Sequence, residues 1–331
     1  MRWTEQPIAV DSRLLLAFNI VIPVTLVLIV ADYLFFNGAI KAFLPSKPED
    51  YVWFAFIFNF PHIMGSMVTY AEGEYIKAYK KPLITGSVLI IFGSLIAVFT
   101  VGYQYYFAFV GFYTIYHLLM QQYGVALMFA KRRPDASFQL WRWLSIAAGG
   151  FMYLSVYRPD LMVPYTNLSL QAFSVIVTAF SMPFGAWFFW KVIAPAADMS
   201  KTTKWYFAAT YAIIPATCVA CAFGYPFLLV IIPRFIHDAT AFTVYAVHDH
   251  NRNLTTKHNI IYRLLAPLHI SPALLCIPLA IALSWYFTAN QMESVPVMAF
   301  LLYFALLHYY MEAYMWKREA PHRKNVPFNI V

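Results

Sequence analysis

The sequence predicts an all-α protein: a polytopic integral membrane bundle of about ten transmembrane helices, with both termini in the cytoplasm. Three observations predict it. The 331-residue chain is 61% hydrophobic and only 11% charged, whereas soluble domains carry about 25% charged residues. Its apolar residues fall into ten runs, close to the roughly 20 residues that a membrane span requires. Its Lys and Arg residues gather in every second loop between these runs, that is, on one side of the predicted membrane.

The first run, residues 14–36, is too long for the core of a signal peptide, and no small-residue cleavage site follows it. We therefore interpret it as an uncleaved first span. The breaks between the runs carry Pro, Gly, Asn, Asp or charge clusters, as turns do. Two breaks, Gly102–Gln104 and Gly224–Pro226, are so short that they predict tight helical hairpins. The other predicted spans are residues 51–70, 83–103, 105–130, 141–157, 170–193, 205–223, 226–248, 264–287 and 295–316.

The positive charges test this span count. With a cytoplasmic N-terminus, 19 of the 23 Lys and Arg residues fall on the cytoplasmic side, three fall on the other side, and Arg234 lies inside a span. The three on the other side are Lys41, Lys47 and Arg158. Cytoplasmic loops of membrane proteins carry an excess of Lys and Arg, and a miscounted span would have scrambled the alternation. The sequence thus predicts a multi-pass protein of the cell (inner) membrane.

Charge and cysteine content also argue against two other classes, nucleic-acid-binding proteins and proteins with a cysteine-based zinc or redox site. The formal charge of +8 is distributed as membrane topology requires, so we predict membrane lipid and no nucleic acid as a partner. Three cysteines are present, and the pair Cys218 and Cys221 lies in an apolar run without nearby histidines, which makes it a weak zinc or redox motif. Residues 1–331 are predicted to form a single membrane-embedded helical domain.

Four histidines lie inside predicted spans at matched depth. Each sits roughly 8–13 residues before the cytoplasmic end of its span, which is about 12–20 Å at 1.5 Å per helical residue. The four imidazoles can therefore share one layer in the middle to cytoplasmic half of the membrane. These residues are His62, His117, His237 and His308.

Other polar residues accompany the histidines. Glu312 follows His308 by four residues and Gln121 follows His117 by four, so each pair shares a helix face. Asp238 adjoins His237, about 100° around the helix. Ionisable groups in lipid cost several kcal/mol unless they have partners, and they usually mark function.

This convergence predicts a metal site. The predicted ligands are His62, His117, His237 and His308, with Asp238 and Glu312 as bridging or terminal carboxylates. Histidine and carboxylate ligands suit iron, manganese or zinc better than magnesium or calcium. Each residue taken alone could instead be a hydrogen-bonded core residue, Gln121 a link between helices, and Asp238 the neutralising partner of Arg234 at i−4.

The leading functional prediction is a membrane-embedded, metal-dependent oxidoreductase or oxygenase, with non-haem and possibly dinuclear iron. An apolar bundle rich in aromatic residues suits a lipophilic substrate, and a low-dielectric cavity protects reactive intermediates from water. Arg234 would hold an acidic substrate headgroup or orient Asp238, and Gln121 would support the site or be a weak ligand. A redox partner protein on the cytoplasmic face fits this function. The chain lacks the H-x-x-H-H repeats of membrane desaturases and the H-E-x-x-H of metalloproteases.

Two alternatives remain open. Transporters of metal ions or proton-coupled solutes also place His, Asp and Glu near the midplane, but the outer halves of the histidine-bearing spans are almost entirely apolar. A haem-b electron carrier with paired axial histidines is less favoured, because Asp238 and Glu312 lie beside the histidines. The remaining histidines are expected in or beside cytoplasmic loops, with H-D-H-N-R-N, residues 248–253, as a helix end and a solvated turn.

Overall fold

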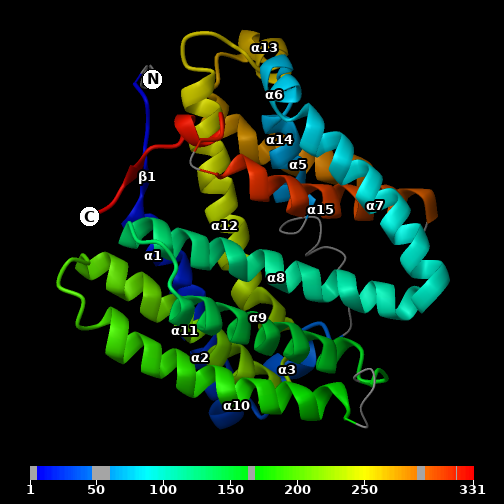
Figure 1. Ribbon diagram of the computed structural model, residues 1–331, viewed down its shortest axis with the longest axis vertical. Coiled ribbons are helices and arrows are strands. Elements are labelled where there is room, and N and C mark those ends of the chain that lie inside the picture. The colour runs from blue at the N-terminus through cyan, green and yellow to red at the C-terminus, as the bar shows by residue number, and fades with distance from the viewer. Residues whose placement is uncertain (1–5, 47–59, 163–167, 289–294, 318) are drawn as a thin grey trace. The chain divides into compact units, whose positions relative to one another are not determined.

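The computed structural model describes residues 6–46, 60–162, 168–288, 295–317 and 319–331 (Figure 1). Most of these residues are helical, which confirms the predicted all-α class. One short sheet pairs β1 (Val10–Asp11) with β2 (Phe328–Asn329) near the two ends of the described chain. Beside this sheet the backbone N–H of Val10 donates to the carbonyl of Pro327 at 2.9 Å.

Each predicted span contains helix, with residues 51–59 of the second span lying outside the described residues. The first span is made of α1 (Ser12–Ala17), η1 (Phe18–Ile20), α2 (Val21–Ala31) and η2 (Asp32–Phe36). The other long helices are α5 (Phe60–Thr69), α7 (Lys80–Val101), α8 (Tyr103–Ala130), α9 (Ala136–Tyr157), α10 (Leu170–Phe188) with η5 (Phe189–Ile193), α11 (Lys201–Ala222), α12 (Pro226–Arg252), α14 (Pro272–Thr288) and α15 (Val295–Met315).

Local chemistry explains where helices begin and end. Asp135, Ser169 and Ser200 cap α9, α10 and α11, each accepting a hydrogen bond from a backbone N–H of the first turn, as N-cap residues do. Gly102 and Gly224 have φ of 89° and 72°, a backbone region that glycine enters without steric cost. They end α7 and α11 at the two predicted tight hairpins.

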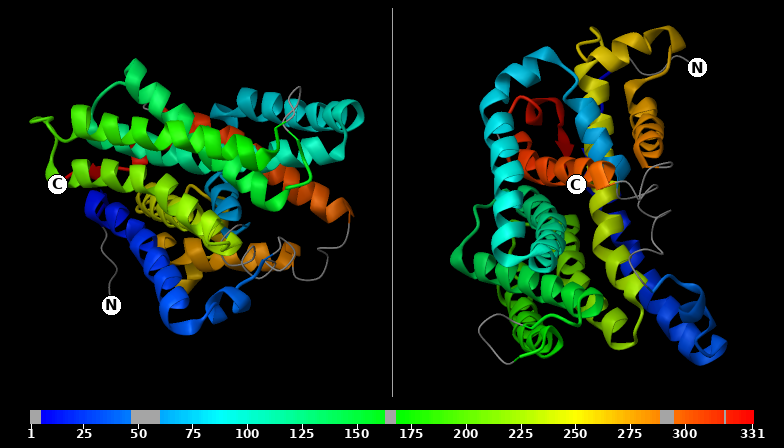
Figure 2. Two further views of the ribbon diagram at one scale, coloured as in Figure 1. Left: turned by 90° about the horizontal axis from the view of Figure 1, so that it is seen from below. Right: turned by 90° about the vertical axis from the view of Figure 1, so that its right-hand side faces the viewer.

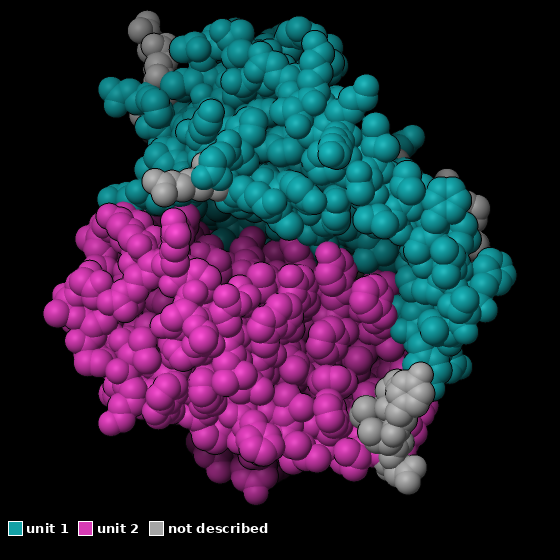
Figure 3. Space-filling view, in the orientation of Figure 1, with its two compact units in different colours: residues 1–10, 52–106, 238–329 teal, residues 11–51, 107–237, 330–331 magenta. Residues whose placement is uncertain are grey.

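The chain forms two compact units (Figure 3). Unit 1 comprises residues 1–10, 52–106 and 238–329, and unit 2 comprises residues 11–51, 107–237 and 330–331. Helix α12 belongs to both, because the division falls between its consecutive residues 237 and 238. The single membrane domain stays a prediction.

In unit 1, α5 packs on α14 and on α15, and α15 packs on α7. The short helices α6 (Gly73–Ala78) and α13 (Ile260–Leu264) connect these helices at one end. Where α7 meets α15, Gly86 permits a close approach: a Cβ atom there would lie 2.6 Å from the Tyr310 ring. The buried core contains Tyr70, Tyr75 and Tyr245 together with Met311 and Met315.

In unit 2, α9 packs along α10, and α11 packs against α2 and α9. Figure 2 shows α9, α10 and α11 running side by side. Their core is aromatic: the Trp141 ring stacks on Phe188 with centroids 5.0 Å apart and meets Tyr123 edge-on at 4.8 Å. The short helix α3 (Ala39–Phe43) follows the first span, where the buried Asp32 accepts hydrogen bonds from the backbone N–H groups of Ile40 and Lys41.

Five helices in the described part of the chain are long and apolar enough to cross a membrane: Ser12–Phe36, Lys80–Val101, Leu170–Ile193, Lys201–Ala222 and Pro226–Arg252. These helices differ in the fraction of their apolar residues that is buried. Helix α7 leaves its apolar side chains almost entirely uncovered, and Phe99 is 85% exposed. Helix α12 buries most of its apolar stretch, although it contains Arg234, His237 and Asp238.

Candidate metal centre

Two of the four predicted histidines pair within unit 1. His62 on α5 and His308 on α15 are fully buried, and their rings meet edge-on with centroids 4.8 Å apart. Packing of α15 against α5 brings the two residues together, although they are far apart in the sequence. The sequence predicted both residues as ligands, and the fold of unit 1 places them in one pair.

A serine fixes the orientation of the His308 ring. The Ser66 hydroxyl donates to the carbonyl of Ile63 at 2.7 Å, so its oxygen is left to accept a hydrogen bond. His308 Nδ1 lies 2.9 Å from this oxygen and therefore carries the proton. The lone pair of the neutral ring is then on Nε2, which is how metal-binding histidines are oriented by a partner on their other nitrogen.

Asp238 occupies the same position relative to His62. Its Oδ1 lies 3.2 Å from His62 Nδ1, and the two side chains are 2% exposed or less. The two atoms are close enough for an ion pair, but the contact lacks the geometry of a hydrogen bond. The sequence predicted Asp238 as a metal ligand, and the structure places its carboxylate beside the ring of His62.

The other two predicted histidines pair within unit 2. His117 on α8 and His237 on α12 are buried, and their rings meet edge-on with centroids 4.7 Å apart. Near this pair in sequence, Gln122 donates to the side-chain oxygen of Gln121 at 3.1 Å and accepts from the hydroxyl of Tyr206 at 2.6 Å. Sequence reasoning selected Gln121 by its spacing and missed the fully buried Gln122.

The remaining predicted site residues are also buried. Glu312 on α15, one turn after His308, is 6% exposed and accepts a hydrogen bond from the hydroxyl of Tyr245. Arg234 is 4% exposed and lies one helical turn before Asp238 on α12. Buried histidine groups of this kind could hold a metal ion. A second group, Glu72, Glu74 and His258, is not assigned as a metal site, because Arg252 pairs with both carboxylates.

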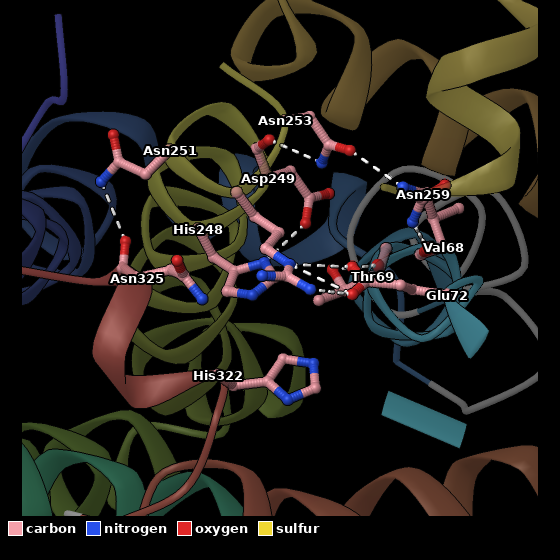
Figure 4. A network of polar contacts seen from close by, with 12 residues as sticks. Val68, Thr69, Glu72, His248, Asp249, Asn251, Asn253, Asn259, His322 and Asn325 are labelled. Carbon is pink, nitrogen blue, oxygen red and sulfur yellow. Dashed lines mark hydrogen bonds and ion pairs between the residues drawn. The ribbon is translucent and has the colours of Figure 1, made fainter. Parts of the chain in front are cut away.

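Sequence reasoning missed a second buried polar network in unit 1 (Figure 4). Residues 248–253 were expected to be a solvated turn, but His248, Asp249 and Asn253 are 1% exposed. Asn253 donates to the carbonyl of Asp249, and Asn259 donates to the carbonyl of Val68 at 2.6 Å. The dense run of His, Asp and Asn in H-D-H-N-R-N was the available signal, since polar groups gathered this closely can satisfy one another when buried.

His322 belongs to this network and was expected in a loop. Its ring is fully buried and lies against Tyr75, with centroids 3.8 Å apart, and against His248 at 4.8 Å. Nδ1 contacts the hydroxyl of Tyr79 at 3.1 Å. Burial is the main cause that lowers the pKa of His322 to about 2, from an ordinary value of 6.5. Burial therefore favours the neutral form of this ring.

This burial predicts a loss of stability in acid. Below about pH 6.5 the unfolded chain protonates His322 and the folded chain does not, so the free energy of unfolding falls as the pH falls. The slope contributed by this residue is about 1.4 kcal/mol per pH unit, and the contribution is fully present above pH 6.5. Thermal unfolding of the wild type and of His322→Phe, compared between pH 7 and pH 5, measures it. Equal pH slopes in the two proteins would contradict the prediction.

Comparison of the chain with protein-family models, with curated proteins and with solved structures finds no match. The geometry of the two histidine pairs and their partners therefore carries the functional argument.

Proposed function

We propose that the protein is a membrane-embedded, metal-dependent oxidoreductase, with non-haem iron as the metal and a lipophilic molecule as the substrate. The observation that carries this is the pair in unit 1. His62 and His308 each contact a partner through Nδ1, one a carboxylate at 3.2 Å and the other a hydroxyl at 2.9 Å. Metal-binding histidines are oriented in this way, by an oxygen atom that contacts the nitrogen on the other side of the ring.

In this proposal all four histidines bind one centre. The matched depth of the four histidines along their predicted spans supports it. Asp238 orients His62, and Glu312, one turn from His308, supplies a carboxylate ligand. The histidines are a group that could hold an ion. Imidazole and carboxylate ligands with open positions suit iron that reacts with dioxygen.

The substrate class is inferred from the aromatic composition of the chain. The chain contains 30 Phe, 24 Tyr and 9 Trp, and a lipophilic molecule can dissolve among such side chains. Arg234 is buried and lies three residues before His237 in the sequence, and it would bind an acidic headgroup. Gln121 accepts a hydrogen bond from Gln122 and would support the ring of His117. A redox partner protein on the cytoplasmic face would supply electrons.

Membrane insertion of the bundle is part of the proposal. The exposed apolar side chains of α7 support it, since Phe92, Ile96 and Phe99 are each more than half exposed. Large exposed apolar patches mark contact with a membrane or with another protein. The distribution of Lys and Arg supports ten spans with both termini in the cytoplasm.

Reporter fusions test the topology. A reporter fused after Arg133 and one fused after Lys324 are both expected to read cytoplasmic, and one fused after Pro45 is expected to read external. These positions follow spans four, ten and one of the predicted count. If the Arg133 and Lys324 fusions lie on opposite sides, the ten-span count is wrong.

Metal analysis of the purified full-length protein, with an optical spectrum, tests the function. We expect stoichiometric iron without a Soret band. A Soret band would favour the haem carrier, although the rings within each histidine pair are in direct contact and leave no room for a porphyrin between them. Metal that exchanges across a sealed vesicle would favour the transporter. A protein without any metal would contradict both the enzyme and the haem carrier.

A further inference from the structure

Tyr75 occupies a distinctive position in unit 1. It lies on α6, is 2% exposed, and contributes to the lining of a surface pocket of about 360 Å³ together with Arg252, Lys324 and Asn325. Its ring stacks on His322, with centroids 3.8 Å apart and planes 28° from parallel. None of the contacts that the metal proposal uses involves this tyrosine.

Hydrogen bonds assign the proton on the Tyr75 hydroxyl. The Asp249 carboxylate accepts from the hydroxyl of Tyr262 at 2.6 Å and lies 2.8 Å from His248 Nδ1. Because a carboxylate only accepts, Nδ1 of His248 carries the proton and Nε2 is an acceptor. The Tyr75 hydroxyl, 2.9 Å from Nε2, therefore donates its proton to His248.

This arrangement prepares Tyr75 to lose an electron. A phenol becomes strongly acidic when one electron is removed, and here an imidazole already accepts its proton. The transfer gives an imidazolium beside the Asp249 carboxylate, which stabilises that charge as the aspartate of a catalytic triad does. His322 cannot compete for the proton, because burial holds its pKa far below the ordinary histidine value.

Aromatic rings continue from Tyr75 toward the proposed centre. His322 lies 5.1 Å from Tyr70 and 6.2 Å from Trp316, centroid to centroid. Trp316 lies 5.9 Å from Tyr245, whose hydroxyl donates to Glu312. The path from Tyr75 to Glu312 therefore runs through side chains of unit 1 that are in contact, so an electron can move along it in short steps.

We propose that Tyr75 is a redox-active tyrosine. One-electron oxidation forms the neutral Tyr75 radical, the O–H bond breaks, the proton bonds to His248 Nε2, and the electron passes along this ring path to the oxidant. In the working protein a metal ion held by the proposed histidine ligands would supply the one-electron oxidant, so this part rests on the proposed function. The radical itself does not, because any one-electron oxidant of sufficient potential can produce it.

The test uses metal-free, full-length protein in lipid nanodiscs and photogenerated ruthenium(III) tris-bipyridine as the oxidant. Electron paramagnetic resonance after the flash is expected to show a long-lived tyrosyl radical in the wild type. Tyr75→Phe should lower its amplitude by about tenfold, and His248→Gln should slow its formation by about tenfold and change the effect of D₂O on the rate. Tyr75→Phe removes one hydroxyl and keeps the stacked ring.

Tyr106→Phe is the matched control. Tyr106 is also buried, but its hydroxyl donates to the Ser94 hydroxyl at 2.7 Å instead of to a base, so the long-lived radical should persist in this variant. An unchanged radical in Tyr75→Phe, or an equal loss in Tyr106→Phe, would overturn the proposal. If Tyr75→Phe does not fold, an unchanged rate in His248→Gln overturns it in the same way.

A second arm separates this inference from the proposed function. Protein loaded with Fe(II) and exposed to dioxygen is expected to form the same radical, and His308→Ala is expected not to form it. A radical in the ruthenium arm without one in the iron arm would support the redox-active tyrosine and contradict the metal-centred oxidation.

Discussion

Replacing His308 by alanine is expected to remove most of the bound metal. The change deletes one imidazole ligand and leaves the hydroxyl of Ser66 without the ring that it orients. If four ligands share the binding free energy of a typical protein metal site, each contributes about 3 kcal/mol, so the affinity should fall roughly a hundredfold. Titration of metal-free protein with Fe(II), followed by metal analysis after gel filtration, measures the change.

His269→Ala is the matched control for this loss. His269 is exposed and follows the short η6 helix (Ala266–Leu268), so its removal should leave the metal content unchanged. Ser66→Ala keeps the His308 ring and removes only its orienting hydroxyl, and it should weaken binding by about tenfold. Full metal content in His308→Ala would contradict the assignment of this residue as a ligand.

Changing Asp238 to asparagine is expected to weaken metal binding about 10- to 100-fold while the protein still folds. An asparagine amide can still reach His62 Nδ1, but it lacks the charge that makes the ring a better ligand. Asp32→Asn is the matched control, because Asp32 is equally buried in unit 2 and accepts hydrogen bonds from Tyr225 and two backbone N–H groups. It should lower stability and leave metal affinity unchanged.

The double variant Arg234→Met with Asp238→Leu decides between a structural and a functional role for these charges. If Arg234 and Asp238 serve only to neutralise each other, apolar replacements of similar size should be neutral or stabilising, as they are for other buried ion pairs. We expect the double variant to insert and fold but to bind metal as weakly as Asp238→Asn. Full metal content and normal turnover would reduce the pair to a neutralised salt bridge.

Periodicity and helix geometry made part of the candidate site predictable. Glu312 follows His308 by four residues, and such spacing places both on one face of any helix. The contact of Asp238 with His62 was not predictable, because the two residues are far apart in the sequence. For the same reason the sequence did not predict Ser66 and Tyr245 as site residues. Ser66 contacts His308 and Tyr245 contacts Glu312, but neither residue stands out within its own helix.

The buried polar network around His248 and His322 was even less predictable from the sequence. His248 and Asp249 looked like a solvated helix end because two asparagines and an arginine follow them within four residues. Only the return of the C-terminal segment, which places His322 against Tyr75 and His248, shows that these groups are buried. No local pattern could predict this, because burial there depends on a segment about 70 residues away.

The sequence by itself determined the helical class, the helix-bearing runs, the two glycine turns at Gly102 and Gly224, and the four histidines, because these depend on composition and on spacing along the chain. Tertiary structure alone decided which histidines pair, which residues contact the rings of His62 and His308, and that Tyr75 donates to His248. Those properties depend on contacts between side chains of different helices, and helix packing fixes such contacts while the order of residues in any one helix does not.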